Sequence, residues 1–131
     1  MRHWLPGRLG MIALVLIAAL VVLLLVRPSA PVVLETRAGL PAGVDADLAG
    51  GEPGWVLDPA ARRVEIYTAG SSSCPTVPRA VDVEGSVMTV TLAPVSAAAC
   101  TDDFAYTTAV VAVPEQVTDL ESLDVELVTA Q

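Results

Sequence analysis

Residues 55 to 68 read WVLDPAARRVEIYT, the pattern of two short strands joined by a tight turn. Asp58 and Pro59 are residue types preferred at the first two positions of a type I turn. After the turn, Val64 and Ile66 alternate with polar residues, so they share one face of an extended strand. This stretch therefore predicts an antiparallel hairpin with a side-chain period of two.

The same period of two continues toward the C-terminus. It recurs over residues 81–84, 87–92 and 123–127, with a turn signal between the first two stretches. Residues 106–113 are rich in β-branched side chains on both faces, which is typical of a central strand. The sequence therefore predicts an all-β domain of about six strands, a small antiparallel sandwich or barrel.

Residues 28–54, upstream of the hairpin, contain several Pro and Gly and predict a spacer. Within it, residues 32–34 are apolar and predict a single strand docked onto the domain. Asp45, Asp47 and Gly50 have the spacing that begins a calcium loop. The ligand set is incomplete, because later ligand positions hold Ala and Val, so we expect no metal there.

The N-terminal residues 9–26 form an uncharged apolar run, LGMIALVLIAALVVLLLV. A helix of this length is about 27 Å long, close to the ~30 Å hydrocarbon core of a membrane. We predict a transmembrane signal anchor over residues 9–27 with residues 1–8 in the cytoplasm, because Arg2 and Arg8 precede the run. A cleaved signal peptide is the alternative, although its apolar region is usually shorter, about 7–15 residues. Both interpretations place the remaining domain outside the cytoplasm, at the cell membrane for the anchor.

The charge of the predicted domain excludes one class of partner. After residue 27 the chain has four Arg, no Lys and fifteen Asp or Glu, a formal charge of −11. Binding of nucleic acid needs clustered Lys and Arg to neutralise phosphate. We therefore expect no nucleic-acid partner.

Cys74 and Cys100 are the only cysteines of the chain. In an exported protein such a pair predicts a disulfide, and residues 55–131 are then a disulfide-bridged β domain. A redox role is disfavoured, because the two cysteines lack the C-x-x-C spacing that lowers a thiol pKa.

The residues needed for most enzyme chemistry are missing from the predicted domain. His3 is the only histidine and lies across the predicted membrane span, and the chain has no Lys. This excludes Ser-His-Asp and Cys-His catalysis and zinc sites built on histidine. Asp102 and Asp103 remain as an acid–base pair, but adjacent residues of an extended chain point to opposite sides. We expect no catalytic residue, no cofactor and no metal site.

The serines 71–73 lie within three residues of Cys74, and Asp102 and Asp103 lie within three residues of Cys100. The bridge would bring these two polar clusters together on loops beside Phe104 and Tyr106. Loops held by a rigid scaffold are where recognition concentrates. The alternative is a turn that only fits around the bridge. The candidate partner-binding residues are Ser71, Ser72, Ser73, Asp102 and Asp103.

The segments GSSSCP (residues 70–75) and ACTDDFAYTT (residues 99–108) resemble those of a group of small actinobacterial envelope proteins, membrane-anchored or secreted. The likeness covers about Trp55 to Val128. It implies an exported β-rich domain with a Cys74–Cys100 bridge and carries over no catalytic residue.

Our hypothesis for the function is non-catalytic binding to, or assembly with, another envelope or membrane protein. A small carboxylate-dependent hydrolase is one alternative, and an accessory subunit of a larger membrane complex is another.

Overall fold

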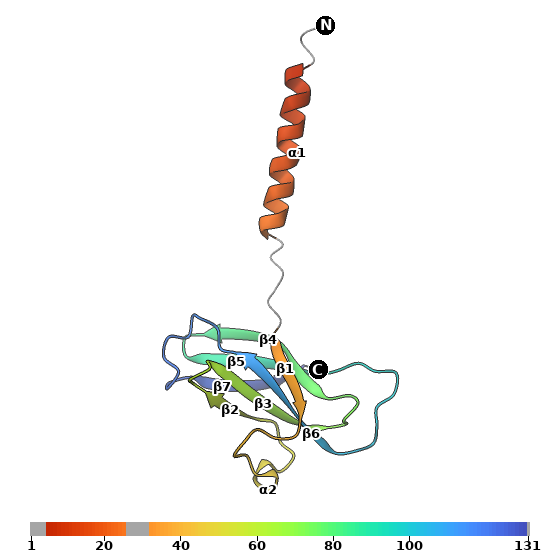
Figure 1. Ribbon diagram of the computed structural model, residues 1–131, viewed down its shortest axis with the longest axis vertical. Coiled ribbons are helices and arrows are strands. Elements are labelled where there is room, and N and C mark those ends of the chain that lie inside the picture. The colour runs from red at the N-terminus through yellow and green to blue at the C-terminus, as the bar shows by residue number, and fades with distance from the viewer. Residues whose placement is uncertain (1–4, 26–31, 131) are drawn as a thin grey trace. The chain divides into compact units, whose positions relative to one another are not determined.

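A computed structural model describes residues 5–25 and 32–130 of the chain (Figure 1). The described residues fall into two units, an N-terminal helix and a β domain that begins at residue 32.

The first unit is helix α1, Leu5–Leu25. Its side chains are described from Gly10 to Val22, and all of these residues are exposed. Among the residues that the structure describes, no helix is long and apolar enough to cross a membrane, where a span takes about 20 apolar residues. The anchor predicted over residues 9–27 is therefore not confirmed. Its last two residues, like residues 1–4 of the predicted cytoplasmic segment, lie outside the described residues.

The second unit is built from strands in two sheets (Figure 1). The first sheet has the order β1-β6-β3-β2 and the second the order β4-β5-β7. This confirms the predicted all-β fold. The strands are β1 Val33–Ala38, β2 Gly54–Asp58, β3 Arg63–Gly70, β4 Thr76–Glu84, β5 Val87–Pro94, β6 Ala105–Ala112 and β7 Asp124–Thr129.

The two sheets pack face to face around one apolar core, as in a sandwich. Val64 and Ile66 of β3 are fully buried there, as the alternation in the sequence predicts. Met88 of β5 faces them from the second sheet and is also fully buried. The core is therefore formed by alternate residues of the central strands. Their apolar side chains, from both sheets, are removed from water when the sheets pack together.

The hairpin predicted from residues 55 to 68 is present as β2 and β3. The strands pair antiparallel from Gly54↔Tyr67 to Asp58↔Arg63. The Asp58 carboxylate accepts a hydrogen bond from the Ala61 N–H at 3.1 Å, which fixes the turn. Arg62 closes the turn with φ 51°, the left-handed region that follows many type I hairpin turns.

One pairing in the second sheet departs from the predicted antiparallel arrangement, because β5 and β7 run parallel. The connection between them passes through β6, which lies in the other sheet. The chain crosses to the first sheet after β5, runs back along β6 and crosses again, so β7 starts beside the start of β5 at Val87↔Asp124. Period and composition predict strands but give no order for them, so the sequence did not indicate this crossover.

Two strands, β4 and β1, extend more than two residues beyond the ranges that the sequence indicates. β4 begins at Thr76 rather than at residue 81. Its first half was not predicted, because Pro78 lacks the N–H that a strand residue donates. The pairing shifts between Pro78 and Ala80, and β4 is at the edge of its sheet, which are the places where strands accept Pro. The strand expected within the spacer is β1, and it extends as far as Ala38 in antiparallel pairing with β6.

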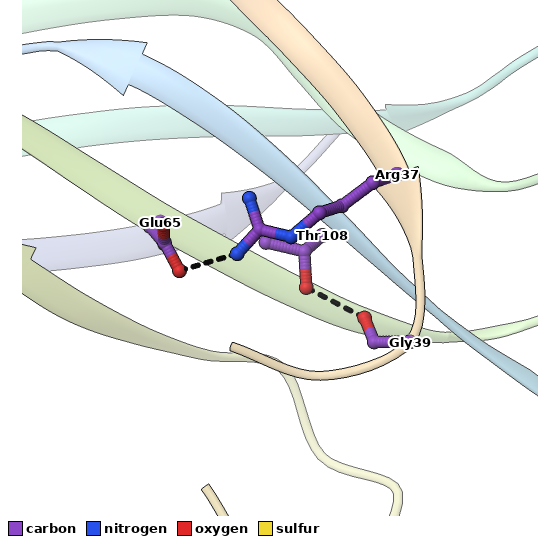
Figure 2. Close-up of polar contacts among 4 residues, drawn as sticks. All are labelled: Arg37, Gly39, Glu65 and Thr108. Atoms are coloured by element: carbon purple, nitrogen blue, oxygen red, sulfur yellow. Dashed lines mark hydrogen bonds and ion pairs between the residues drawn. The ribbon is translucent and has the colours of Figure 1, made fainter. Parts of the chain in front are cut away.

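The outer face of the first sheet is covered near β6, which explains why that strand is apolar on both faces. Thr108 and Val110 point away from the core, yet both are buried. Arg37 of β1 passes over β6 to Glu65 of β3 with N···O 2.6 Å (Figure 2). The Thr108 hydroxyl donates to the Gly39 carbonyl at 2.6 Å (Figure 2). The loop after β1 is thus fastened to the sheet next to the candidate site.

Candidate functional site

The candidate site is built on the loops that flank two neighbouring strands. β3 ends at Gly70 and β6 begins at Ala105, and these two residues are paired in the sheet. Cys74 follows the first and Cys100 precedes the second, and they form a disulfide with a Cα–Cα distance of 5.4 Å. The predicted bridge is confirmed. It joins the loop after β3 to the loop before β6.

A set of hydroxyl groups surrounds the bridge and is tied together by Thr101. The Thr101 Oγ1 lies 3.0 Å from the Ser71 Oγ and 3.0 Å from the Ser73 Oγ. The Thr101 backbone N–H donates to the Ser73 Oγ at 2.8 Å. The Cys74 N–H donates to the Ser71 Oγ at 3.3 Å, so the serine turn also fixes the buried cysteine.

Asp103 accepts hydrogen bonds from both loops. The Ser72 backbone N–H donates to its Oδ1 at 3.1 Å, and the Thr101 hydroxyl donates to the same oxygen. Hydrogen bonds from the Ser72 side chain, the Thr101 hydroxyl and the Ser72 N–H lower the pKa of Asp103 from 3.8 to about 2. Asp103 is therefore an ionised acceptor near neutral pH. We name Ser71, Ser72, Ser73, Thr101 and Asp103 the hydroxyl cluster.

Of the five residues predicted from the sequence, four belong to this cluster and Asp102 does not. Asp102 is exposed, and no hydrogen bond among the described residues uses its side chain. Thr101, the residue that contacts most of the others, was not predicted. Its position directly after Cys100 was a usable signal, because the bridge places that position opposite the serines.

The aromatic residues next to the cluster join it to the loop between β1 and β2. The rings of Phe104 and Tyr106 are 5.3 Å apart and meet edge to face. The Tyr106 hydroxyl donates to the Ala46 carbonyl at 3.3 Å and accepts from the Gly51 N–H at 3.2 Å. Between these two residues lies the one-turn helix α2, Ala46–Ala49, capped by Asp45.

Phe104 itself faces solvent. The residue is 68 % exposed, while Tyr106, Tyr67 and Trp55 are half-buried. Leu48 of α2 is 88 % exposed. These two apolar side chains were not predicted as a pair, because no local pattern indicates that the β1–β2 loop reaches β6.

A small cavity of about 160 Å³ opens between the sheets and offers no acid–base pair. Its lining contains hydroxyl and apolar groups but no titratable side chain. The lining residues are Gly51, Pro53, Thr68, Ala69, Thr76, Leu92 and Thr129.

In the described part of the chain, no group of three or more His, Cys, Asp or Glu side chains is placed to hold a metal ion. Comparisons of the chain with known protein families, with curated proteins and with solved structures give no match.

Proposed function

We propose that the chain is a non-catalytic binding or assembly module of the cell envelope, with its β domain outside the cytoplasm. The observation that carries this proposal is the exposed Phe104 on a loop that a disulfide fixes to its neighbour. A rigid loop that presents an aromatic side chain to solvent suits recognition, because little conformational entropy is lost on binding.

The chemistry of the carboxylates favours binding over hydrolysis. A carboxylate-dependent hydrolase needs one acid that holds a proton near the working pH. The pKa of Asp103 is instead lowered to about 2, because its hydrogen-bond donors stabilise the ionised form. Asp103 therefore does not hold a proton near neutral pH. Asp103 therefore suits a structural or electrostatic role.

Retention at the membrane is part of the same proposal. Apolar side chains of α1, such as Met11, Leu14 and Leu16, are exposed in the structure. Contact with water is unfavourable for so large an apolar surface, and the lipid of a membrane would cover it. The apolar run continues through residues 23–26, whose side chains lie outside those described. The N-in orientation rests on Arg2 and Arg8, and the envelope location rests on the resemblance to actinobacterial envelope proteins.

The test is chemical crosslinking on intact cells that express the tagged full chain, followed by recovery from membranes. N-terminal sequencing of the recovered chain should give Met1 or the residue after it, and protease added outside should remove a C-terminal tag. A specific crosslinked partner should be lost in an Asp102→Asn/Phe104→Ser variant. It should be kept in the matched variant Asp82→Asn/Leu34→Ser, which changes an exposed acid and an exposed apolar side chain elsewhere.

A C-terminal tag that protease cannot reach would refute the extracytoplasmic location. A partner that survives in the first variant, or that is lost equally in both, would refute recognition through this loop.

A further inference from the structure

The exposed apolar residues beside the hydroxyl cluster lie on two segments that Tyr106 fastens together. Phe104 stacks edge-on against the Tyr106 ring, and its own ring lies against Gly51. The Tyr106 hydroxyl binds the backbone on both sides of Leu48, at Ala46 and at Gly51. Phe104 and Leu48 are therefore held on one part of the domain surface by defined contacts.

Phe104 is unusual among the aromatic side chains that the structure describes, because it alone is exposed. The domain has few aromatic residues, and the others are half-buried. Because Phe104 lies largely in water, the domain loses the stabilisation that burying this aromatic side chain would give. Exposed aromatic and leucine side chains of this kind act as anchors when a partner covers them.

The charges around these two side chains have one sign. The segments 39–53 and 95–105 carry five acids and no Arg, Lys or His. All five acids are exposed, and in the described part of the chain none of them forms a salt bridge. The acids are Asp45, Asp47, Glu52, Asp102 and Asp103.

We propose that this surface, formed by Phe104, Leu48 and the four acids outside the hydroxyl cluster, binds a cationic segment of a partner protein that inserts an apolar side chain against Phe104. These four acids are Asp45, Asp47, Glu52 and Asp102. The proposal rests on the proposed binding function and specifies the partner's chemistry. Lys and Arg on the partner satisfy the unpaired acids and steer the encounter, while the apolar contact supplies the affinity.

Charge disfavours three other occupants of the surface. A second copy of the chain would bring a domain of formal charge −11 against another, with acids facing acids. Anionic lipid headgroups and nucleic acid are repelled for the same reason.

The test uses the full chain in micelles of a non-ionic detergent and a labelled peptide, Ser-Lys-Ser-Lys-Trp-Lys-Ser-Lys-Ser, followed by fluorescence anisotropy. Two comparison peptides replace all Lys by Glu, or Trp by Ser. The first should show no binding, and the second should bind about tenfold more weakly, as for loss of an apolar anchor. Binding of the parent peptide should weaken as salt is raised.

Matched variants separate this surface from general attraction to an acidic protein. Leu48→Ser/Phe104→Ser should weaken the parent peptide about tenfold or more, whereas Leu34→Ser/Val128→Ser, also at exposed positions, should change it less than twofold. Asp45→Asn/Asp47→Asn/Asp102→Asn should weaken it more than Asp82→Asn/Asp124→Asn/Glu126→Gln, which removes the same charge from the second sheet. Asn keeps the capping ability of position 45.

Equal effects of the two acid variants would overturn the proposal, because binding would then follow net charge alone. Equal effects of the two apolar variants would also overturn it, because Phe104 and Leu48 would then not be the apolar contact. So would a chain that dimerises through this surface, seen as a mass change in light scattering that Leu48→Ser/Phe104→Ser abolishes. If the crosslinked partner depends on Phe104 but the peptide does not bind, the proposed function stands and this partner chemistry is wrong.

Discussion

The two surfaces beside the disulfide differ in how their polar groups are used. In the hydroxyl cluster, the oxygens of Ser71, Ser73 and Thr101 lie within hydrogen-bond distance of one another, and Asp103 accepts from both loops. On the surface around Phe104 and Leu48, the exposed acids have no basic partner among the described residues. The cluster is satisfied internally, whereas the Phe104 surface is open.

This difference assigns separate roles to residues that are adjacent in the chain. A hydrogen bond already made within the protein must be broken before a ligand uses the same group, and that costs most of what the new bond returns. Exposed apolar surface has no such cost, since covering it releases water. The serines therefore position the loop, and Phe104, with Asp102 beside it, is the part left to contact a partner.

The largest expected effect comes from cutting the bridge that both surfaces depend on. Cys74→Ala/Cys100→Ser should lower the free energy of unfolding by about 3.5 kcal/mol, the chain-entropy value for a closed loop of this length between cysteines 26 residues apart. Denaturant unfolding of the full chain in detergent measures it.

Reduction of the wild-type protein serves as the control and should give the same midpoint as the double variant. An unchanged midpoint in both would mean that the hydroxyl cluster holds the loops without the bridge, so that the two surfaces do not share this dependence.

A smaller effect is expected from removing the hydroxyl that fastens the β1–β2 loop. Tyr106→Phe should cost about 1 kcal/mol, because it removes the acceptor of the Gly51 N–H. It also removes one of the two donors to the Ala46 carbonyl, which keeps its bond from the Gly50 N–H. Amide hydrogen exchange at Gly51 should become faster.

The matched control is Tyr67→Phe. The Tyr67 ring packs over Gly54, but no hydrogen bond among the described residues uses its hydroxyl. Tyr67→Phe should therefore leave both quantities unchanged. Equal costs for the two variants would show that the Tyr106 hydroxyl does not fasten the loop.

The smallest effect is a pH dependence that arises from Asp103. Its pKa falls from 3.8 to about 2 in the folded protein, so the folded state favours the ionised form. This contribution to stability is complete above about pH 4 and is lost as the pH falls toward 2. The melting temperature of the wild type should drop over that window more than that of Asp103→Asn. Identical drops would show that the hydrogen bonds to Asp103 are not maintained in solution.

Much of the β domain could be predicted from the sequence, because its signals are local. Val64 and Ile66 alternate with polar residues, and Asp58 with Pro59 marks the turn, so the hairpin follows from propensity and period. The bridge was predicted from two cysteines in a chain expected to be exported. In each case the residues that carry the signal are those that form the feature.

The features that the sequence did not predict depend on contacts between distant parts of the chain. The parallel pairing of β5 with β7 depends on where the chain crosses between sheets, and no residue of β7 encodes it. The exposed pair Leu48 and Phe104 depends on Tyr106 reaching the backbone of a loop about 60 residues earlier, at Ala46. Thr101 was missed for the same reason, since its hydroxyl partners belong to the other loop.

The most direct test of the separate roles is the affinity of the cationic Trp peptide for two full-length variants compared side by side with the wild type. Ser71→Ala/Ser73→Ala should bind the peptide within about twofold of the wild type and melt at a lower temperature. Leu48→Ser/Phe104→Ser should melt as the wild type does and bind the peptide at least about tenfold more weakly. The opposite pattern, with affinity lost in the serine variant and kept in the Phe104 variant, would contradict this division between a positioning cluster and a binding surface.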